Sequence, residues 1–210
     1  MNRLALLGDS ILDNGPYVKP EPDTADHLQR SLGAAWSLDL LARDGSTIAD
    51  LRFQLAELAS DTEVGVLSVG GNDAVEHIGL LDPKPTTNTK LLADVAAMSE
   101  GFATAYDPLL EDLQGRVRRL LVCTIYEPPL IDETTARLAR VPLAVLNDQI
   151  IRVAARRGLD ILDLRAVCTE PADFVKEIEP SPRGAHKIAL AIANAIQPAL
   201  GKAGVRFFAV

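Results

Sequence analysis

The sequence is poor in cysteine, histidine and aromatic residues, and each shortage limits the kinds of functional site that the chain can form. Its two cysteines, Cys123 and Cys168, lie far apart and form no Cys-x-x-Cys pair, which argues against a disulfide framework and a cysteine-based zinc site. Both thiols are expected to be reduced and buried. Three histidines, His27, His77 and His186, leave few candidates for a group that exchanges protons near neutral pH.

Long apolar runs and basic clusters are missing as well. No apolar stretch approaches the ~20 residues that cross a bilayer, and the apolar opening meets Asp9 too soon to be a signal peptide. Lysine and arginine do not cluster, and the net charge is −8 with a sequence pI of about 4.9. We therefore expect a cytoplasmic protein without a nucleic-acid or membrane partner, and the oligomeric state stays open.

The composition is that of a globular protein with a hydrophobic core. The 210 residues are 48% hydrophobic and 24% charged, which predicts one domain over residues 1–210. Short apolar segments alternate with amphipathic ones, as in an α/β protein whose parallel sheet is covered by helices on both faces. Strands are expected at 4–7, 35–42, 64–69, 120–125 and 159–164, and helices at 24–33, 48–58, 90–113, 133–157 and 184–200. The tail, 205–210, is either an edge strand or a packed terminus.

Polar clusters follow the first three expected strands, at the points where a parallel sheet binds its ligands. The clusters are Gly8-Asp9-Ser10, Asp44-Gly45-Ser46 and Gly70-Gly71-Asn72-Asp73. They suit acyl transfer, in which a serine such as Ser10 attacks a carbonyl carbon. The N–H of Gly45 and the side-chain amide of Asn72 can donate to the oxyanion that forms.

In these three clusters the chain resembles the SGNH (GDSL-type) hydrolase family, a group of serine esterases and lipases. The ending Pro180-Ser181-Pro182-Arg183-Gly184-Ala185-His186 is similar to a further block of that family, so the resemblance covers nearly the whole chain. It implies a three-layer flavodoxin-like sandwich with a mostly parallel central sheet. It also implies Ser10 as nucleophile with the Gly45 N–H and the Asn72 side chain as oxyanion donors. No metal or organic cofactor is implied.

One block departs from the family pattern, in which Asp-x-x-His-Pro supplies the general base and the acid that orients it. Here Glu179 precedes Pro180 and Lys176 stands three residues earlier, so both groups are replaced. Glu179 could itself be the base if burial raises its pKa, although a pairing with Lys176 would lower that pKa. Alternatively, His77 or His186 approaches Ser10, or the base is lost and the protein binds without cleaving.

The leading hypothesis is a serine hydrolase that cleaves small carboxylic esters through an acyl-enzyme. The aromatic content of 4% leaves no aromatic-rich lid, which favours small esters over long-chain lipids. A non-catalytic binding protein on the same scaffold is the main alternative, and an acyltransferase that uses the same acyl-enzyme is another.

The candidate site residues fall into two groups. The catalytic group is Ser10, Gly45, Asn72 and Glu179, and the substrate-binding group is Asp9, Asp73 and His77. Asp9 and Asp73 can also fix their own turns through side-chain hydrogen bonds. The loops 83–89 and 126–132 are expected to line the pocket.

Overall fold

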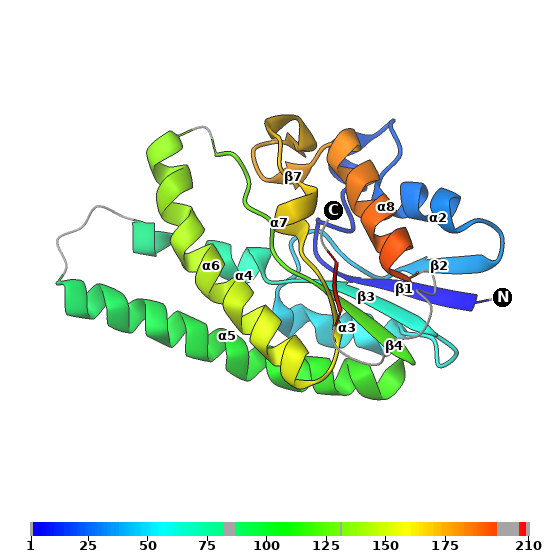
Figure 1. Cartoon of the computed structure of the whole chain (residues 1–210), viewed down its shortest axis with the longest axis horizontal. Coiled ribbons are helices and arrows are strands. Elements are labelled where there is room, and N and C mark those ends of the chain that lie inside the picture. The colour runs from blue at the N-terminus through cyan, green and yellow to red at the C-terminus, as the bar shows by residue number, and fades with distance from the viewer. Residues whose placement is uncertain (1, 82–86, 131, 197–205, 209–210) are drawn as a thin grey trace.

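A computed structural model describes residues 2–81, 87–130, 132–196 and 206–208. It shows a three-layer α/β architecture with a parallel central sheet, which confirms the expected flavodoxin-like sandwich (Figure 1). The main sheet has the strand order β2-β1-β3-β4-β5-β8, and a two-stranded antiparallel hairpin, β6-β7, lies apart from it. The strands are β1 (Asn2–Gly8), β2 (Trp36–Leu40), β3 (Val64–Ser68), β4 (Arg119–Cys123), β5 (Asp160–Leu162), β6 (Phe174–Val175), β7 (Glu179–Pro180) and β8 (Phe207–Phe208).

Helices cover both faces of this sheet. The α-helices are α1 (Gly15–Val18), α2 (Thr24–Leu32), α3 (Leu51–Glu57), α4 (Gly71–Glu76), α5 (Asn88–Arg116), α6 (Glu133–Arg156), α7 (Leu164–Val167) and α8 (Pro182–Ile196). Three short 3₁₀ turns are η1 (Ile48–Asp50), η2 (Ile78–Leu81) and η3 (Pro171–Asp173). One core lies between the sheet and α2, α7 and α8, and a second lies between the sheet and α3, α5 and α6 (Figure 1).

Local signals set the bounds of the elements. Leu4 to Leu7 are fully buried because β1 is a central strand with both faces covered. The Asp23 side chain accepts a hydrogen bond from the Asp26 N–H at 2.8 Å and caps α2, which ends at Gly33 with a φ of 72°. The tail contributes β8, which pairs with β5 in parallel, so part of the expected 205–210 segment is an edge strand.

The sheet register brings distant polar clusters to one edge. Gly8 at the end of β1 pairs with Ser68 at the end of β3, and the Asp9 N–H donates to the Ser68 carbonyl at 3.0 Å. Gly8 has a φ of 130°, and a Cβ atom there would lie 1.7 Å from the Ser68 carbonyl oxygen. Only glycine fits, so the first and third clusters meet because the backbones approach this closely.

Candidate active site

A cleft of about 620 Å³ opens at the carboxyl edge of the sheet. It is lined by five of the predicted site residues, namely Asp9, Ser10, Asn72, His77 and Glu179. Most of its other walls are apolar, from α4, η2, the segment after β4 and α6; they include Val75, Ile78, Leu81, Ile125, Pro128, Leu130, Pro142 and Leu143. The prediction that 126–132 lines the pocket is confirmed at Tyr126, Pro128, Leu130 and Asp132. The other expected loop, 83–89, falls mainly outside the described residues.

Glu179 lies beside the candidate nucleophile. Ser10 is 8% exposed and Glu179 is 7% exposed, and both line the cleft. Burial raises the pKa of the Glu179 carboxyl, an interaction with the Ser10 hydroxyl lowers it, and the balance is a raised pKa. Glu179 Oε2 is buried and has no hydrogen-bond partner among the described residues. An uncompensated carboxylate oxygen next to a serine is a group able to take up a proton.

A second buried carboxyl group lies next to the same serine. Asp9 is 1% exposed; its Oδ1 accepts from the Ile11 N–H at 3.1 Å, while its Oδ2 has no partner in the described part of the chain. Burial raises the pKa of Asp9 to about 7, the Ile11 N–H lowers it, and the charge of Glu179 raises it further. Asp9 therefore fixes its own turn, as expected, and also adds negative potential to the cleft.

Lys176 does not form the pair that would have lowered the pKa of Glu179. It is exposed in the turn between β6 and β7, and within the described ranges no carboxylate forms an ion pair with it. Lys176 and Glu177 have φ values of 50° and 72°, in the left-handed region that most residues avoid. The tight hairpin turn thus holds the lysine in solvent and places Glu179 at the cleft.

The histidines divide between two places. His77 lies at the end of α4 and lines the cleft, with an exposed side chain. His186 lies on α8 and faces His27 of α2, with the two Nδ1 atoms 3.4 Å apart and the ring centroids 4.9 Å apart. His186 is not among the residues that line the cleft, so only His77 remains beside Glu179 as a candidate base.

Asn72 is held by the loop that contains Gly45. Its Nδ2 donates one hydrogen bond to the Ser46 carbonyl at 2.9 Å, and the second amide proton is left for a ligand. Gln54 supports the same loop by donating to Ser46 Oγ at 3.2 Å and to the Gly8 carbonyl at 2.8 Å. Gly45 itself is exposed with a φ of 79° and is not among the residues that line the cleft.

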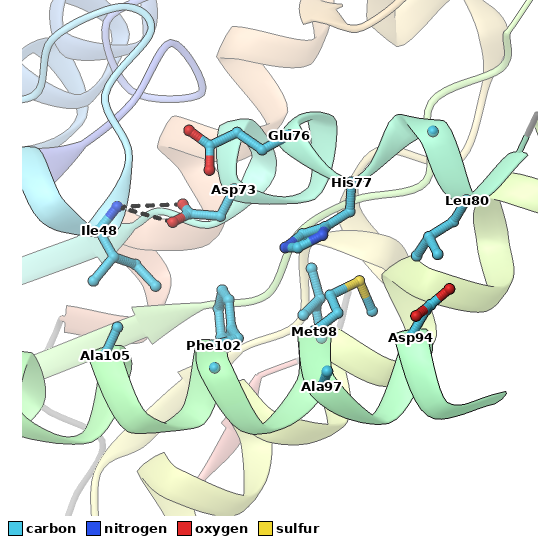
Figure 2. A pocket seen from close by; sticks show the side chains of 13 residues that line it. Ile48, Asp73, Glu76, His77, Leu80, Asp94, Ala97, Met98, Phe102 and Ala105 are labelled. Carbon is cyan, nitrogen blue, oxygen red and sulfur yellow. Dashed lines mark hydrogen bonds between the residues drawn. The ribbon is translucent and has the colours of Figure 1, made fainter. Parts of the chain in front are cut away.

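Asp73 belongs to a different cavity from the other predicted residues. Both of its carboxylate oxygens accept from the Ile48 N–H at 3.2 Å (Figure 2). Asp73, Glu76 and His77 line a cavity of about 630 Å³ between α4 and α5, where Met98 and Phe102 form part of the wall (Figure 2). Asp73 therefore anchors the start of η1 instead of fixing its own turn, and His77 lines both cavities.

Two residues that support the site were not singled out from the sequence. Tyr126 donates its hydroxyl to the Ile178 carbonyl at 2.6 Å, and Asn14 donates its Nδ2 to the Pro180 carbonyl at 3.0 Å. Tyr126 follows β4, so the rule that ligands bind after parallel strands pointed to its segment. Asn14 lies in a turn with no such signal, and its partner is 166 residues away.

A comparison with models of known protein families shows which family the chain belongs to. The model of the GDSL-like lipase/acylhydrolase family matches residues 6–187, which span all the clusters described above. The chain belongs to the GDSL-like lipase/acylhydrolase family. Its members hydrolyse esters, so this chain is an ester-cleaving hydrolase by family. No curated protein matches the chain in sequence.

Solved structures of GDSL-type hydrolases share the fold. An extracellular lipase from Streptomyces rimosus has 15% identity and a TM-score of 0.69, and the match covers 93% of this chain and 99% of that one. A phospholipase A1 from Streptomyces albidoflavus has 18% identity and a TM-score of 0.69, with 92% and 98% coverage. A lipolytic G-D-S-L family protein from Veillonella parvula has 15% identity and a TM-score of 0.71, with 95% and 100% coverage. At these identities the likeness establishes the fold of this GDSL-like chain.

None of the helices that the structure describes has the length and apolar character needed to cross a membrane. The two longest, α5 and α6, carry charged residues along their exposed sides and pack on the sheet through the second core.

Proposed function

We propose that the chain hydrolyses small carboxylic esters through an acyl-enzyme on Ser10, with Glu179 as the general base. The observation that carries this proposal is the placement of a buried, unpartnered carboxyl oxygen of Glu179 in the same cleft as Ser10. The apolar walls of that cleft favour an ester whose acyl or alcohol group is apolar.

The reaction begins when the Ser10 hydroxyl attacks the carbonyl carbon and its proton passes to the Glu179 carboxylate. The carbonyl π-bond opens, and the oxyanion receives hydrogen bonds from the Asn72 amide and from the Ser10 N–H. Collapse expels the alcohol, which takes the proton from Glu179. Water then attacks the acyl-enzyme, gives a proton to Glu179, and the acid leaves as Ser10 recovers that proton.

A glutamate base changes the charge arrangement of the reaction. With a histidine base, proton transfer creates a cation beside the oxyanion; with Glu179, the single negative charge moves from the carboxylate to the oxyanion. Burial disfavours the ionised form of Glu179 and so raises its pKa, which makes it a stronger base than a solvated glutamate. The negative charge thus leaves a poorly solvated site and reaches one with hydrogen-bond donors.

An ester-hydrolysis assay on short-chain aryl esters tests this proposal. We expect Ser10→Ala and Glu179→Gln each to lower kcat/KM by about 10² or more. The base must be ionised, so wild-type activity should rise as the pH climbs through the raised pKa of Glu179, and this acid limb should be missing from the residual activity of Glu179→Gln.

Histidine variants separate Glu179 from the remaining alternative. His186→Gln is the matched control, because His186 packs against His27, and its activity should equal that of wild type. A His77→Gln variant that loses as much activity as Ser10→Ala, while Glu179→Gln keeps its activity, would replace Glu179 by His77 as the base. Wild-type activity no higher than that of Ser10→Ala would refute the hydrolytic mechanism and favour a binding protein.

A further inference from the structure

The turn that carries Glu179 is held on both sides by buried side chains from other elements. On the preceding side, the Tyr126 hydroxyl donates to the Ile178 carbonyl at 2.6 Å. Tyr126 is 4% exposed, and its ring packs edge-on against Phe174 of β6 with centroids 5.0 Å apart. Burial raises the pKa of Tyr126 well above its usual value, so the hydroxyl keeps the proton that it donates.

On the following side, the Asn14 amide donates to the Pro180 carbonyl at 3.0 Å. Asn14 is fully buried, and its Oδ1 accepts from the Thr24 N–H at 2.9 Å and from the Thr24 hydroxyl at 3.0 Å. The Thr24 N–H can only donate, so the orientation of the Asn14 amide is fixed by its partners. The start of α2 is thereby connected to the residue that follows Glu179.

A glutamate base needs such support more than a histidine does. A histidine has a second ring nitrogen whose N–H an acidic residue can hold, which fixes the ring without touching its backbone. A carboxylate that accepts the serine proton has no second N–H to offer, and Glu179 Oε2 has no hydrogen-bond partner among the described residues. Its position must therefore come from its backbone and from packing.

The geometry points to Tyr126 and Asn14 as positioning residues for Glu179: by holding the carbonyls of Ile178 and Pro180, they fix the carboxyl group against Ser10. This inference rests on the proposed role of Glu179 as base. The two hydrogen bonds do for this chain what an orienting acid does for a histidine, and the exposed Lys176 takes no part.

The test compares two tyrosine variants that each lose one buried hydroxyl. Tyr126→Phe removes the bond to Ile178 and keeps the ring that lines the cleft. Tyr106→Phe is the matched control, because Tyr106 is a fully buried residue of α5 and its hydroxyl has no partner among the described residues. We expect kcat to fall about 10- to 100-fold in Tyr126→Phe with KM changed less than kcat, and no change in Tyr106→Phe.

The pH profile distinguishes a positioning role from a purely structural one, because a purely structural role would leave the profile unchanged. A loosened turn lets water reach Glu179 and relieves the burial that raises its pKa, so the acid limb of kcat/KM should shift to lower pH in Tyr126→Phe. Asn14→Ala should shift the limb in the same direction, and a thermal unfolding curve shows whether this variant is folded. A Tyr126→Phe profile identical to that of Tyr106→Phe would overturn the inference.

A double variant distinguishes this inference from the proposed function. In the Glu179→Gln background, Tyr126→Phe should cause no further loss, because the group that it positions is gone. If Glu179→Gln keeps wild-type activity, the proposed base is wrong and the inference falls with it. If Glu179→Gln is impaired but Tyr126→Phe still lowers its residual activity by the same factor as in wild type, the base stands and only the positioning role is refuted.

Discussion

Two buried carboxyl groups, Asp9 and Glu179, share the cleft with one serine, and within the described residues no cation forms an ion pair with either. Buried carboxylates without partners are unfavourable in a folded protein, because burial penalises their charged form. In the proposed mechanism, the penalty at Glu179 makes its carboxylate a better proton acceptor. The penalty for ionisation is larger at Asp9, because its side chain is almost completely buried beside Ser10.

Ionisation of the Asp9 carboxyl should lower the free energy of unfolding as the pH rises. Its pKa is about 7 in the folded protein and near 3.8 when exposed, so its contribution is fully present below about pH 4 and is lost as the pH passes through 7. Asp9→Asn cannot ionise, so its advantage in free energy of unfolding over wild type should grow between pH 4 and pH 8, to at most about 4 kcal/mol. Urea unfolding at several pH values measures this difference. A difference that does not change with pH would show that Asp9 does not titrate in this range.

At the scale of elements, the β6-β7 hairpin and α8 act together to deliver Glu179. Ser181 lies between β7 and α8 and holds both to η3, which directly precedes β6. Its N–H donates to the Asp173 carbonyl at 2.9 Å and its hydroxyl donates to the Ala172 carbonyl at 2.7 Å. The first turn of α8 then packs so closely on η3 that a Cβ atom at Gly184 would lie 2.1 Å from the Asp173 carbonyl oxygen. These contacts therefore fix the position of the start of α8 relative to the hairpin.

Two glycine-to-alanine variants measure how tight this junction is. Gly184→Ala forces the backbone of η3 or α8 to move, and should lower the free energy of unfolding by about 2 kcal/mol or more. Gly101→Ala is the control within another helix, α5, where a Cβ atom meets nothing within 4 Å. It should raise the free energy of unfolding by about 0.5–1 kcal/mol through helix propensity alone. Equal effects in denaturant unfolding would argue against a tight junction.

At the scale of the whole molecule, one carboxylate connects the far edge of the sheet to α8 and to the C-terminal strand. Asp160 at the start of β5 accepts from Arg119 of β4 at 2.7 Å and from Arg206 at 2.6 Å. Arg119 also donates to the Ile196 carbonyl at 2.9 Å at the end of α8. Four segments that are distant in sequence thus meet at a carboxylate that is largely buried.

Removing that charge should loosen this edge of the sheet. Asp160→Asn leaves two guanidinium groups without their anion and should lower the free energy of unfolding by about 2–3 kcal/mol. Burial alone would raise the pKa of Asp160, but hydrogen bonds from Arg206 and Arg119 outweigh it and lower the pKa. Its stabilisation is therefore present above about pH 4 and is lost as the pH falls below that, so the two proteins should converge in acid.

The control for this prediction is Asp148→Asn. Asp148 pairs with Arg152 one turn away on the exposed side of α6, and such a surface pair is worth less than about 0.5 kcal/mol. Thermal unfolding of the two variants at pH 7 compares them directly. A loss in Asp160→Asn as small as that in Asp148→Asn would mean that the carboxylate is not a structural anchor.

Local pattern was enough to predict most elements of this protein. Apolar runs and the bounds of the helix expected at 24–33 depend on neighbours a few residues away, so the sequence shows them directly. The alternation of strands and helices fixed the parallel sheet, and with it the edge where Ser10 and Asn72 meet. The hypothesis that Glu179 stands in place of a histidine base also came from the sequence.

Only the tertiary structure decided which groups surround that glutamate. Asn14 reaches Pro180 across 166 residues, and Tyr126 reaches Ile178 across 52, through contacts that no local pattern encodes. The pKa of a carboxyl group depends on burial and on charges brought from other elements, so the raised pKa of Glu179 has no counterpart in sequence. His186 shows the same limit, since only the packing of α8 on α2 places it against His27 and outside the residues that line the cleft.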